Sequence, residues 1–380
     1  MKLSSYISSG ALALALALMP GQIQASDWSH YSGWRDPGGA VFTMDNSATG
    51  NHVLAYLRTP TGKLLPDGTF KTGGLGSGNG LGNQGGLVLS ENGRWLFVCN
   101  AGSDEITVFL VTKHGLVRTH KVDCQGKRPI SLALHRNLLF VLNAGGQAGD
   151  KDGIAGFFFF AGRLYPLPNS KHALSADNTA PAQISFSPNG EVLVVTEKAT
   201  GILDTFTVDN DGSIDDYKQF PSVGQTPFGF AFRRDDLIVS EAFGGAPDGS
   251  ALSSYDVDND GELEVISPSV PTTETAACWV VITGNGRYAY TSNAGSGSIS
   301  GYRIAHDGSI SLLDADGVTG DTGPGSGPID MALAGGSRFL YSLNGGNQTL
   351  GAFRVKADGS LEAIPGISGL PAGANGLAAK

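Results

Sequence analysis

The sequence predicts an all-β protein, a seven-bladed β-propeller of four-stranded antiparallel blades. The first observation is a repeat of about 40 to 50 residues, a period that is typical of propeller blades. Each copy contains an apolar strand, a Gly-containing turn and a second apolar strand that ends in a polar residue, most clearly at 87–100, 184–197, 280–293 and 331–344. The second observation is the 56 glycines among 380 residues, which suit many short strands and turns.

The residue that ends the second strand marks each copy in order. It is Asp45 in the first copy, and then Asn100, Asn143, Glu197, Glu241, Asn293 and Asn344. The first copy begins at its second strand, and residues 373–379 resemble the start of an inner strand. We therefore expect the C-terminal segment to complete the first blade and close the ring, because an open ring exposes unpaired strand edges.

Asp-Gly turns predict the hairpins between third and fourth strands, at 209–212, 258–261, 306–308 and 357–359. The DxDxDG string at 256–261 is therefore interpreted as a hairpin. A calcium-binding loop requires Glu at its twelfth position, which here is Ser267. The GxGxxG string at 80–85 precedes a strand instead of a helix, so we interpret it as a Gly-rich connection between blades.

Composition and the N-terminal residues limit the class of protein. A formal net charge of −10 argues against nucleic acid and anionic lipid as partners. Lys2, the apolar run 11–18 and Ala25 predict a signal peptide over 1–25, followed by an N-terminal lead over 26–39 and one propeller domain over 40–380. We expect a secreted or periplasmic monomer without a membrane span, whose three cysteines are buried free thiols.

Strand direction places a candidate site at one mouth of the central channel, where inner strands start and second strands end. Glu197 and Glu241 are the candidate catalytic acid and base. Asp45 and Asp330 are candidate ligands of a divalent cation, Ca²⁺ or Mg²⁺, because such cations prefer carboxylate oxygens. The candidate substrate-binding residues are Asn100, Asn143, Gln183, Trp279, Asn293 and Asn344.

Four carboxylates in one mouth would repel one another. This predicts either a bound cation or a raised pKa at Glu197 or Glu241. The open alternative is that these polar side chains form only a hydrated channel lining.

Several motifs resemble the seven-bladed lactonase family, which contains cycloisomerase-type 6-phosphogluconolactonases and carboxymuconate-lactonising enzymes. They are the run 187–190 after an inner strand, the Asn-Ala-Gly endings at Asn100, Asn143 and Asn293, and the Asp-Gly turns. The runs 196–198, 240–245 and 276–279 are typical of the exported branch. The resemblance covers about residues 38–380 and is strongest to exported members of the 3-carboxymuconate cyclase type. It implies that a small lactone is hydrolysed or formed at the channel mouth.

One departure from the family pattern concerns the substrate. The phosphogluconolactonase branch has a G-P-R-H motif where this chain has residues 180–183, so Ala182 and Gln183 replace its Arg and His. Gln cannot titrate, and no other Arg or Lys falls at the predicted mouth positions, although Arg128 and Lys198 lie just outside them. This argues against a phosphorylated or tricarboxylate substrate. An exported lactonase-like hydrolase, a non-catalytic extracellular protein that binds a protein partner, and a cycloisomerase all remain open.

Overall fold

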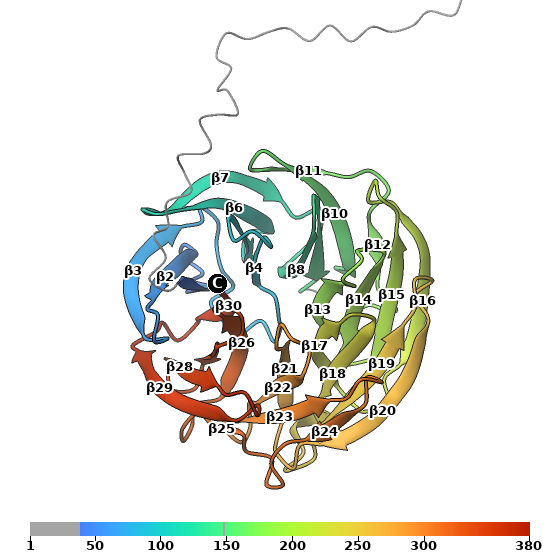
Figure 1. The fold of residues 1–380 in the computed structure, drawn as a ribbon. Helices are drawn as coiled ribbons and strands as arrows, with labels where there is room; N and C mark the ends of the chain where they lie inside the picture. Colours follow the sequence, from blue (N-terminus) through green and yellow to red (C-terminus); the bar gives the residue numbers. More distant parts are fainter. Residues whose placement is uncertain (1–38, 147–148) are drawn as a thin grey trace, which may run out of the picture. The chain divides into compact units, whose positions relative to one another are not determined.

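The computed structural model describes residues 39–146 and 149–380, which form a seven-bladed β-propeller (Figure 1). The predicted fold is confirmed, because every blade contains a four-stranded antiparallel sheet and two blades add a fifth short strand. The predicted signal peptide and nearly all of the lead lie outside the described residues. The described part contains no helix of the length and apolarity needed to cross a bilayer.

The first four blades take up the N-terminal half of the ring. Blade 1 contains β1 (Ala40–Met44), β2 (His52–Arg58), β3 (Leu64–Lys71) and β30 (Asn375–Ala379). Blade 2 contains β4 (Leu87–Leu89), β5 (Trp95–Asn100), β6 (Glu105–Thr112) and β7 (Gly115–Asp123). Blade 3 contains β8 (Pro129–His135), β9 (Leu138–Ala144), β10 (Asp152–Phe160), β11 (Arg163–Pro166) and β12 (His172–Ala173). Blade 4 contains β13 (Pro181–Phe186), β14 (Val192–Glu197), β15 (Ile202–Val208) and β16 (Ile214–Pro221).

The other three blades complete the ring. Blade 5 contains β17 (Pro227–Arg233), β18 (Asp236–Glu241), β19 (Ala251–Val257) and β20 (Leu263–Pro271), with a 3₁₀ turn, η2 (Phe243–Gly245), after β18. Blade 6 contains β21 (Ala277–Ile282), β22 (Tyr288–Asn293), β23 (Ser298–Ile304), β24 (Ile310–Leu312) and β25 (Gly320–Asp321). Blade 7 contains β26 (Pro328–Ala334), β27 (Phe339–Asn344), β28 (Thr349–Val355) and β29 (Leu361–Ser368).

Closure by the C-terminal strand is confirmed. Strand β30 pairs antiparallel with β1, with Val41 opposite Ala379 and Met44 opposite Asn375. The backbone of Lys380 donates to the Ala40 carbonyl at 2.9 Å and extends this pairing. Figure 1 shows β30 beside β26, at the place where blades 7 and 1 meet.

The core lies between neighbouring blades, because each sheet is apolar on both faces. One cluster joins Phe97 of blade 2 to Phe157 of blade 3, and another joins Val194 of blade 4 to Tyr255 of blade 5. Buried tyrosines satisfy their hydroxyls across the blade interface, as where the Tyr290 hydroxyl donates to the Gly359 carbonyl at 2.7 Å. Burying such rings supplies much of the stability of a propeller.

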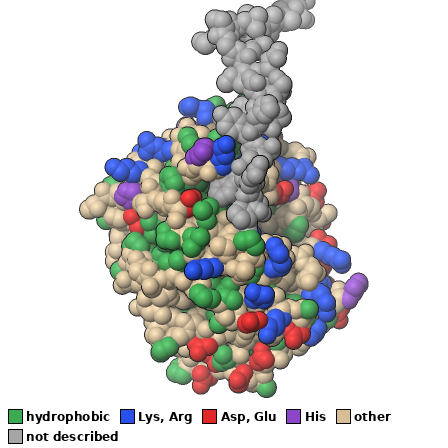
Figure 2. All heavy atoms as spheres, turned by 60° about the vertical axis from the view of Figure 1, so that its left-hand side comes forward, with side chains coloured by type: hydrophobic (Ala, Val, Ile, Leu, Met, Phe, Trp, Pro, Cys, Tyr) green, Lys and Arg blue, Asp and Glu red, His purple; other side chains and the backbone are tan. Residues whose placement is uncertain are grey.

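Two smaller predictions are also confirmed. The predicted Asp-Gly turns join third and fourth strands, and the 258–261 turn is closed by the Gly261 N–H, which donates to the Asp258 carbonyl at 3.1 Å. All three cysteines, Cys99, Cys124 and Cys278, are buried free thiols. Figure 2 shows the side of the ring that contains β3, where acidic side chains gather at the lower edge and Lys and Arg are dispersed among hydrophobic side chains.

Candidate functional site

Three of the four asparagines at the predicted mouth positions end their strands, and Asn143 lies one residue before the end of β9. The side chains of all four are buried within the sheets. The Asn100 amide donates to the Thr107 hydroxyl at 2.8 Å, and the Asn344 amide donates to the Thr349 hydroxyl at 2.9 Å. The Asn293 amide donates to two serine hydroxyls of β23, and the Asn143 amide donates to the Cys124 carbonyl at 3.3 Å. These contacts stabilise the blades, so a substrate-binding role for these asparagines stays a prediction.

Glu241 is fully buried and is bound by three donors. The Gly224 N–H donates to it at 2.9 Å, the Ser269 hydroxyl donates at 2.5 Å, and the Ser253 hydroxyl is a third donor. Burial raises the pKa of Glu241, and the three donors oppose this shift. Because Gly224 precedes the inner strand of blade 5, the carboxylate fixes the connection from blade 4.

Glu197 is also fully buried and lies beside a second carboxyl group. It accepts from the Ser175 N–H at 2.9 Å and from the hydroxyls of Ser175 and Thr200. Its carboxyl partner is Asp204 on β15, which accepts from the Tyr217 hydroxyl at 2.9 Å. Burial, followed by the neighbouring Glu197, raises the pKa of Asp204 to about 9.

The Oδ2 atom of Asp204 is buried and has no donor among the described residues. A carboxyl oxygen that faces another carboxylate can be satisfied by carrying a proton and donating it. The structure therefore assigns a proton to Asp204 at the side that faces Glu197. Asp204 lies inside a largely apolar strand, so its position in the sequence does not mark it as a site residue.

The expected crowding of four carboxylates is not what the structure shows. Asp45 binds His52 Nδ1 at 2.8 Å, whereas Asp330 accepts from the N–H groups of Met331 and Leu377 at 2.7 and 2.9 Å. None of these four described carboxylates forms a hydrogen bond with another of the four. Within 39–146 and 149–380 no three His, Cys, Asp or Glu side chains lie close enough together to hold a metal ion. The separate contacts of Asp45 and Asp330 do not suit a shared cation, and their metal role stays a prediction.

A plug segment, defined here as residues 82–86, crosses the channel and bonds to several inner strands. It belongs to the long Gly-rich connection from β3 to β4, which runs into the centre of the ring (Figure 1). The Gln84 amide exchanges two hydrogen bonds with the backbone of Val280 in blade 6, at 2.8 and 3.0 Å. The Gln84 N–H donates to the Ala182 carbonyl of blade 4 at 3.0 Å, and the Leu132 N–H of blade 3 donates to the Gly85 carbonyl at 2.9 Å. The plug therefore connects inner strands on opposite sides of the channel.

Two predicted substrate-binding residues take part in this packing. The Trp279 indole donates to the Asn83 carbonyl of the plug at 2.7 Å, and its ring lies 4.8 Å from that of Phe228. The Gln183 amide exchanges two hydrogen bonds with the backbone of Phe230, at 3.0 and 2.7 Å. Gln183 thus fastens blade 4 to blade 5, which gives the residue at the family's His position a structural function.

A second set of residues lies one position beyond the buried polar strand ends. In five blades the residue immediately before the inner strand has a positive φ. Its backbone carbonyl accepts a hydrogen bond from the N–H of the residue that follows the polar end of the second strand. Side chains alternate along a strand, so a residue and its successor face opposite ways. We call these residues the mouth tier; they pair as Arg128 with Ala144, Ala180 with Lys198, Thr226 with Ala242, Ala276 with Ala294, and Gly327 with Gly345.

Lys198 and Arg128 are the charged members of the mouth tier. The Lys198 amine donates to the carbonyls of Gly82 and Pro181, the latter at 3.1 Å, and lies 4.6 Å from the centre of the Phe228 ring. Burial lowers the pKa of Lys198 to about 8; the Arg128 charge also lowers it, whereas Cys278 opposes the shift. In the described part of the chain neither cation forms an ion pair with a carboxylate. The Lys198 amine thus lies against the plug, and the charge of Arg128 acts on it. This positive charge weakens the sequence-based argument against an anionic substrate.

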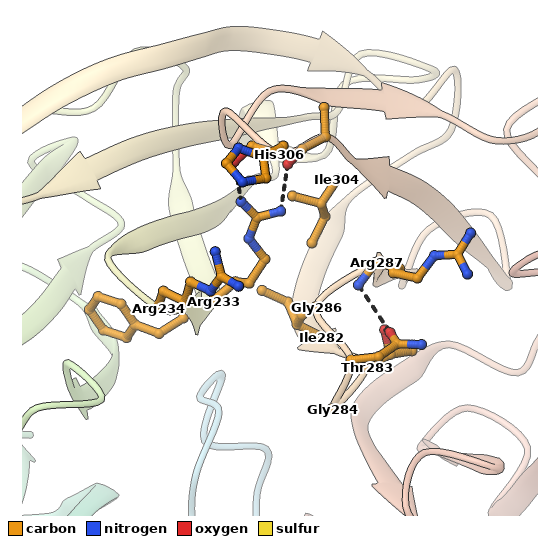
Figure 3. Close-up of a pocket in the computed structure, with 12 residues that line it drawn as sticks. Arg233, Arg234, Ile282, Thr283, Gly284, Gly286, Arg287, Ile304 and His306 are labelled. Carbon is orange, nitrogen blue, oxygen red and sulfur yellow. Dashed lines mark hydrogen bonds between the residues drawn. The ribbon is translucent and has the colours of Figure 1, made fainter.

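A cleft of about 550 Å³ lies between blades 5 and 6, at the ends of their inner strands and therefore away from the mouth. Figure 3 shows the Arg233 side chain reaching the 305–306 turn, where it donates to the carbonyls of Ala305 and His306 at 2.5 and 3.2 Å. Arg233 also forms an ion pair with Asp236. Its charge is therefore used to join two hairpins, and Arg287 extends away from it in the same view.

No protein-family model and no curated protein matches the sequence. Among solved structures, a putative 6-phosphogluconolactonase from Bacteroides fragilis has a TM-score of 0.69 at 14% identity and covers 92% of this chain and 99% of its own. The periplasmic gluconolactonase of Pseudomonas aeruginosa has a TM-score of 0.69 at 14% identity, covering 90% of this chain and 98% of its own. A hypothetical selenium-binding protein from Sulfolobus tokodaii has a TM-score of 0.63 at 11% identity, covering 90% and 94%. At identities this low, the structural similarity shows a shared fold alone, and lactonase-type propellers are among the proteins that have this fold.

Proposed function

We propose that this protein is a lactonase-like hydrolase whose active site is the channel mouth above the plug. One observation carries the proposal: the half-buried amine of Lys198 is bound by backbone carbonyls, is acted on by the fixed charge of Arg128, and forms no ion pair with a carboxylate among residues 39–146 and 149–380. The fold shared with two lactonase-type structures supports the reaction class. The substrate would be a small neutral or anionic lactone.

The mouth tier supplies the groups that lactone hydrolysis requires, which are a base for water and positive charge for the oxyanion. Neutral Lys198 would accept a proton from water as the water oxygen attacks the carbonyl carbon. The guanidinium of Arg128 would stabilise the negative charge that develops on the carbonyl oxygen. When the ring C–O bond breaks, the Lys198 ammonium would return its proton to the leaving alkoxide, giving a hydroxy acid.

A pH–rate profile on a panel of lactones tests this proposal. A lysine base with a pKa of about 8 predicts a rate that rises with pH and levels off above that value. Lys198→Met should lower kcat/KM by about 100-fold or more. Lys113→Met, which changes an exposed lysine on another loop, should leave it unchanged. A plateau already reached near pH 6 would instead support the predicted carboxylate pair, Glu197 and Glu241, and the absence of turnover with every lactone would reject the hydrolase.

The burial of both predicted catalytic carboxylates favours a second candidate function, non-catalytic binding of an anionic ligand or protein partner at the same mouth. In that case the ligand would bind in a manner that depends on Arg128 and would not be turned over. The signal-like N-terminus and the periplasmic location named for the Pseudomonas aeruginosa structure support action outside the cytoplasm for either function.

A further inference from the structure

The amine of Lys198 is held in a geometry that suits a nucleophile. A neutral amine has two N–H donors and one lone pair. The carbonyls of Gly82 and Pro181 accept from this amine, so both donors have partners while the lone pair remains available. Because Gly82 belongs to the plug and Pro181 begins β13, the backbone holds the nitrogen from two sides.

The surroundings of the amine favour its neutral form. Phe228 and Cys278 are buried in one apolar cluster with Ala182, Ala242 and Trp279, and burial disfavours the charged amine. The face of the Phe228 ring, 4.6 Å from the amine, attracts the charged form and opposes this effect. The charged and titratable groups that act on the amine are Arg128 and Cys278. A lysine that is desolvated beside another cation is the arrangement that activates amines toward carbonyl carbon.

Arg128 limits what this amine would bind. It is a permanent cation, and a guanidinium matches a carboxylate in shape and charge. A ligand that satisfies both groups carries a carboxylate and a carbonyl carbon a few bonds apart.

We propose that the channel mouth captures a small oxo acid, with the Lys198 amine forming an imine at its carbonyl carbon and Arg128 binding its carboxylate. The nitrogen lone pair attacks the carbonyl carbon, and the C=O electron pair moves to oxygen, which takes a proton. The carbinolamine then loses water as the C=N bond forms, so no oxidant or reductant is involved. This inference shares the mouth with the proposed function but requires no lactone turnover.

Reductive trapping on the full chain tests the inference. The protein is incubated with glyoxylate or succinic semialdehyde and sodium cyanoborohydride, and the adduct is located by peptide mass mapping. We expect one fast adduct, at Lys198, whose rate increases with pH through about 8. Lys198→Arg, which keeps the charge, should abolish it, and Lys113 serves as the exposed reference lysine within the same molecule.

Butanal, a neutral aldehyde, separates the contribution of Arg128 from that of Lys198. Arg128→Leu should slow trapping of succinic semialdehyde about tenfold, the effect of one lost charge-assisted contact, and leave trapping of butanal no slower. Labelling of Lys198 at the rate of Lys113, or equal rates for the Arg128→Leu variant and the unmodified protein with succinic semialdehyde, would overturn the inference. Trapping without lactone turnover would reject only the proposed hydrolase, whereas Lys198-dependent turnover without trapping would reject only the imine.

Discussion

Replacing Asp204 by Asn should remove a pH dependence from the stability of the protein. Asp204 is fully buried, and its pKa is raised from 3.8 to about 9 by burial and by Glu197. The folded state therefore holds a proton that the unfolded state releases above about pH 4. Because the unfolded state binds fewer protons between these two pKa values, the free energy of unfolding falls as the pH rises.

The size of this effect follows from one proton. One bound proton contributes about 1.4 kcal/mol per pH unit, or roughly 3 kcal/mol between pH 6 and pH 8. Asn has the same shape as a protonated Asp: its oxygen can accept from Tyr217 and its amide can donate to Glu197. We therefore expect the stability of Asp204→Asn, relative to the unmodified protein, to increase by that amount across this interval.

Urea unfolding at several pH values between 6 and 8 measures the difference. Asp211→Asn is the matched control, because Asp211 is exposed and its pKa is lowered by hydrogen bonds from Ser213. The pKa of Asp211 lies well below pH 6 in both the folded and the unfolded state. The difference in stability between Asp211→Asn and the unmodified protein should therefore not change with pH. If the Asp204→Asn difference is equally constant from pH 6 to pH 8, the proton assigned to Asp204 is refuted.

Three further predictions concern stability and can be measured by urea unfolding or thermal melting. Glu241→Ala should lower the free energy of unfolding by about 3 kcal/mol, because three donors lose their acceptor. Glu241→Gln keeps an acceptor and should cost less. Equal stability of the unmodified protein and both variants would contradict this prediction. Gln84→Ala should cost about 2 kcal/mol by removing both bonds to Val280, while Gln225→Ala, at an exposed position, should change stability by less than about 0.5 kcal/mol. Deletion of residues 373–380 should abolish cooperative unfolding, because blade 1 loses its inner strand, and an unchanged melting temperature would exclude closure by β30.

The sequence was sufficient to predict the ring because its signals are local and repeated. Apolar runs that end in Asn100 or Glu197 mark second strands, and Asp-Gly pairs mark hairpins. The missing inner strand of the first copy led directly to β30, because a closed ring must pair every inner strand. These inferences need only strand periodicity and turn chemistry.

The site was harder to predict because it depends on side-chain direction. Glu197 and Lys198 are adjacent, but the first is fully buried and the second reaches the plug. The β3–β4 connection was recognised as a Gly-rich linker, yet nothing local in it indicates that Gln84 binds Val280 across the channel. The available signal was its length, since residues 72–86 connect blades 1 and 2 whereas 124–128 suffice between blades 2 and 3.

A crystal structure of the protein with a small carboxylate, such as glyoxylate without reductant, tests the location of the site most directly. The account predicts density for the ligand above the plug, with its carboxylate at Arg128 and its carbonyl carbon at Lys198. An empty mouth at saturating concentration, or a ligand bound only in the cleft between blades 5 and 6, would contradict it.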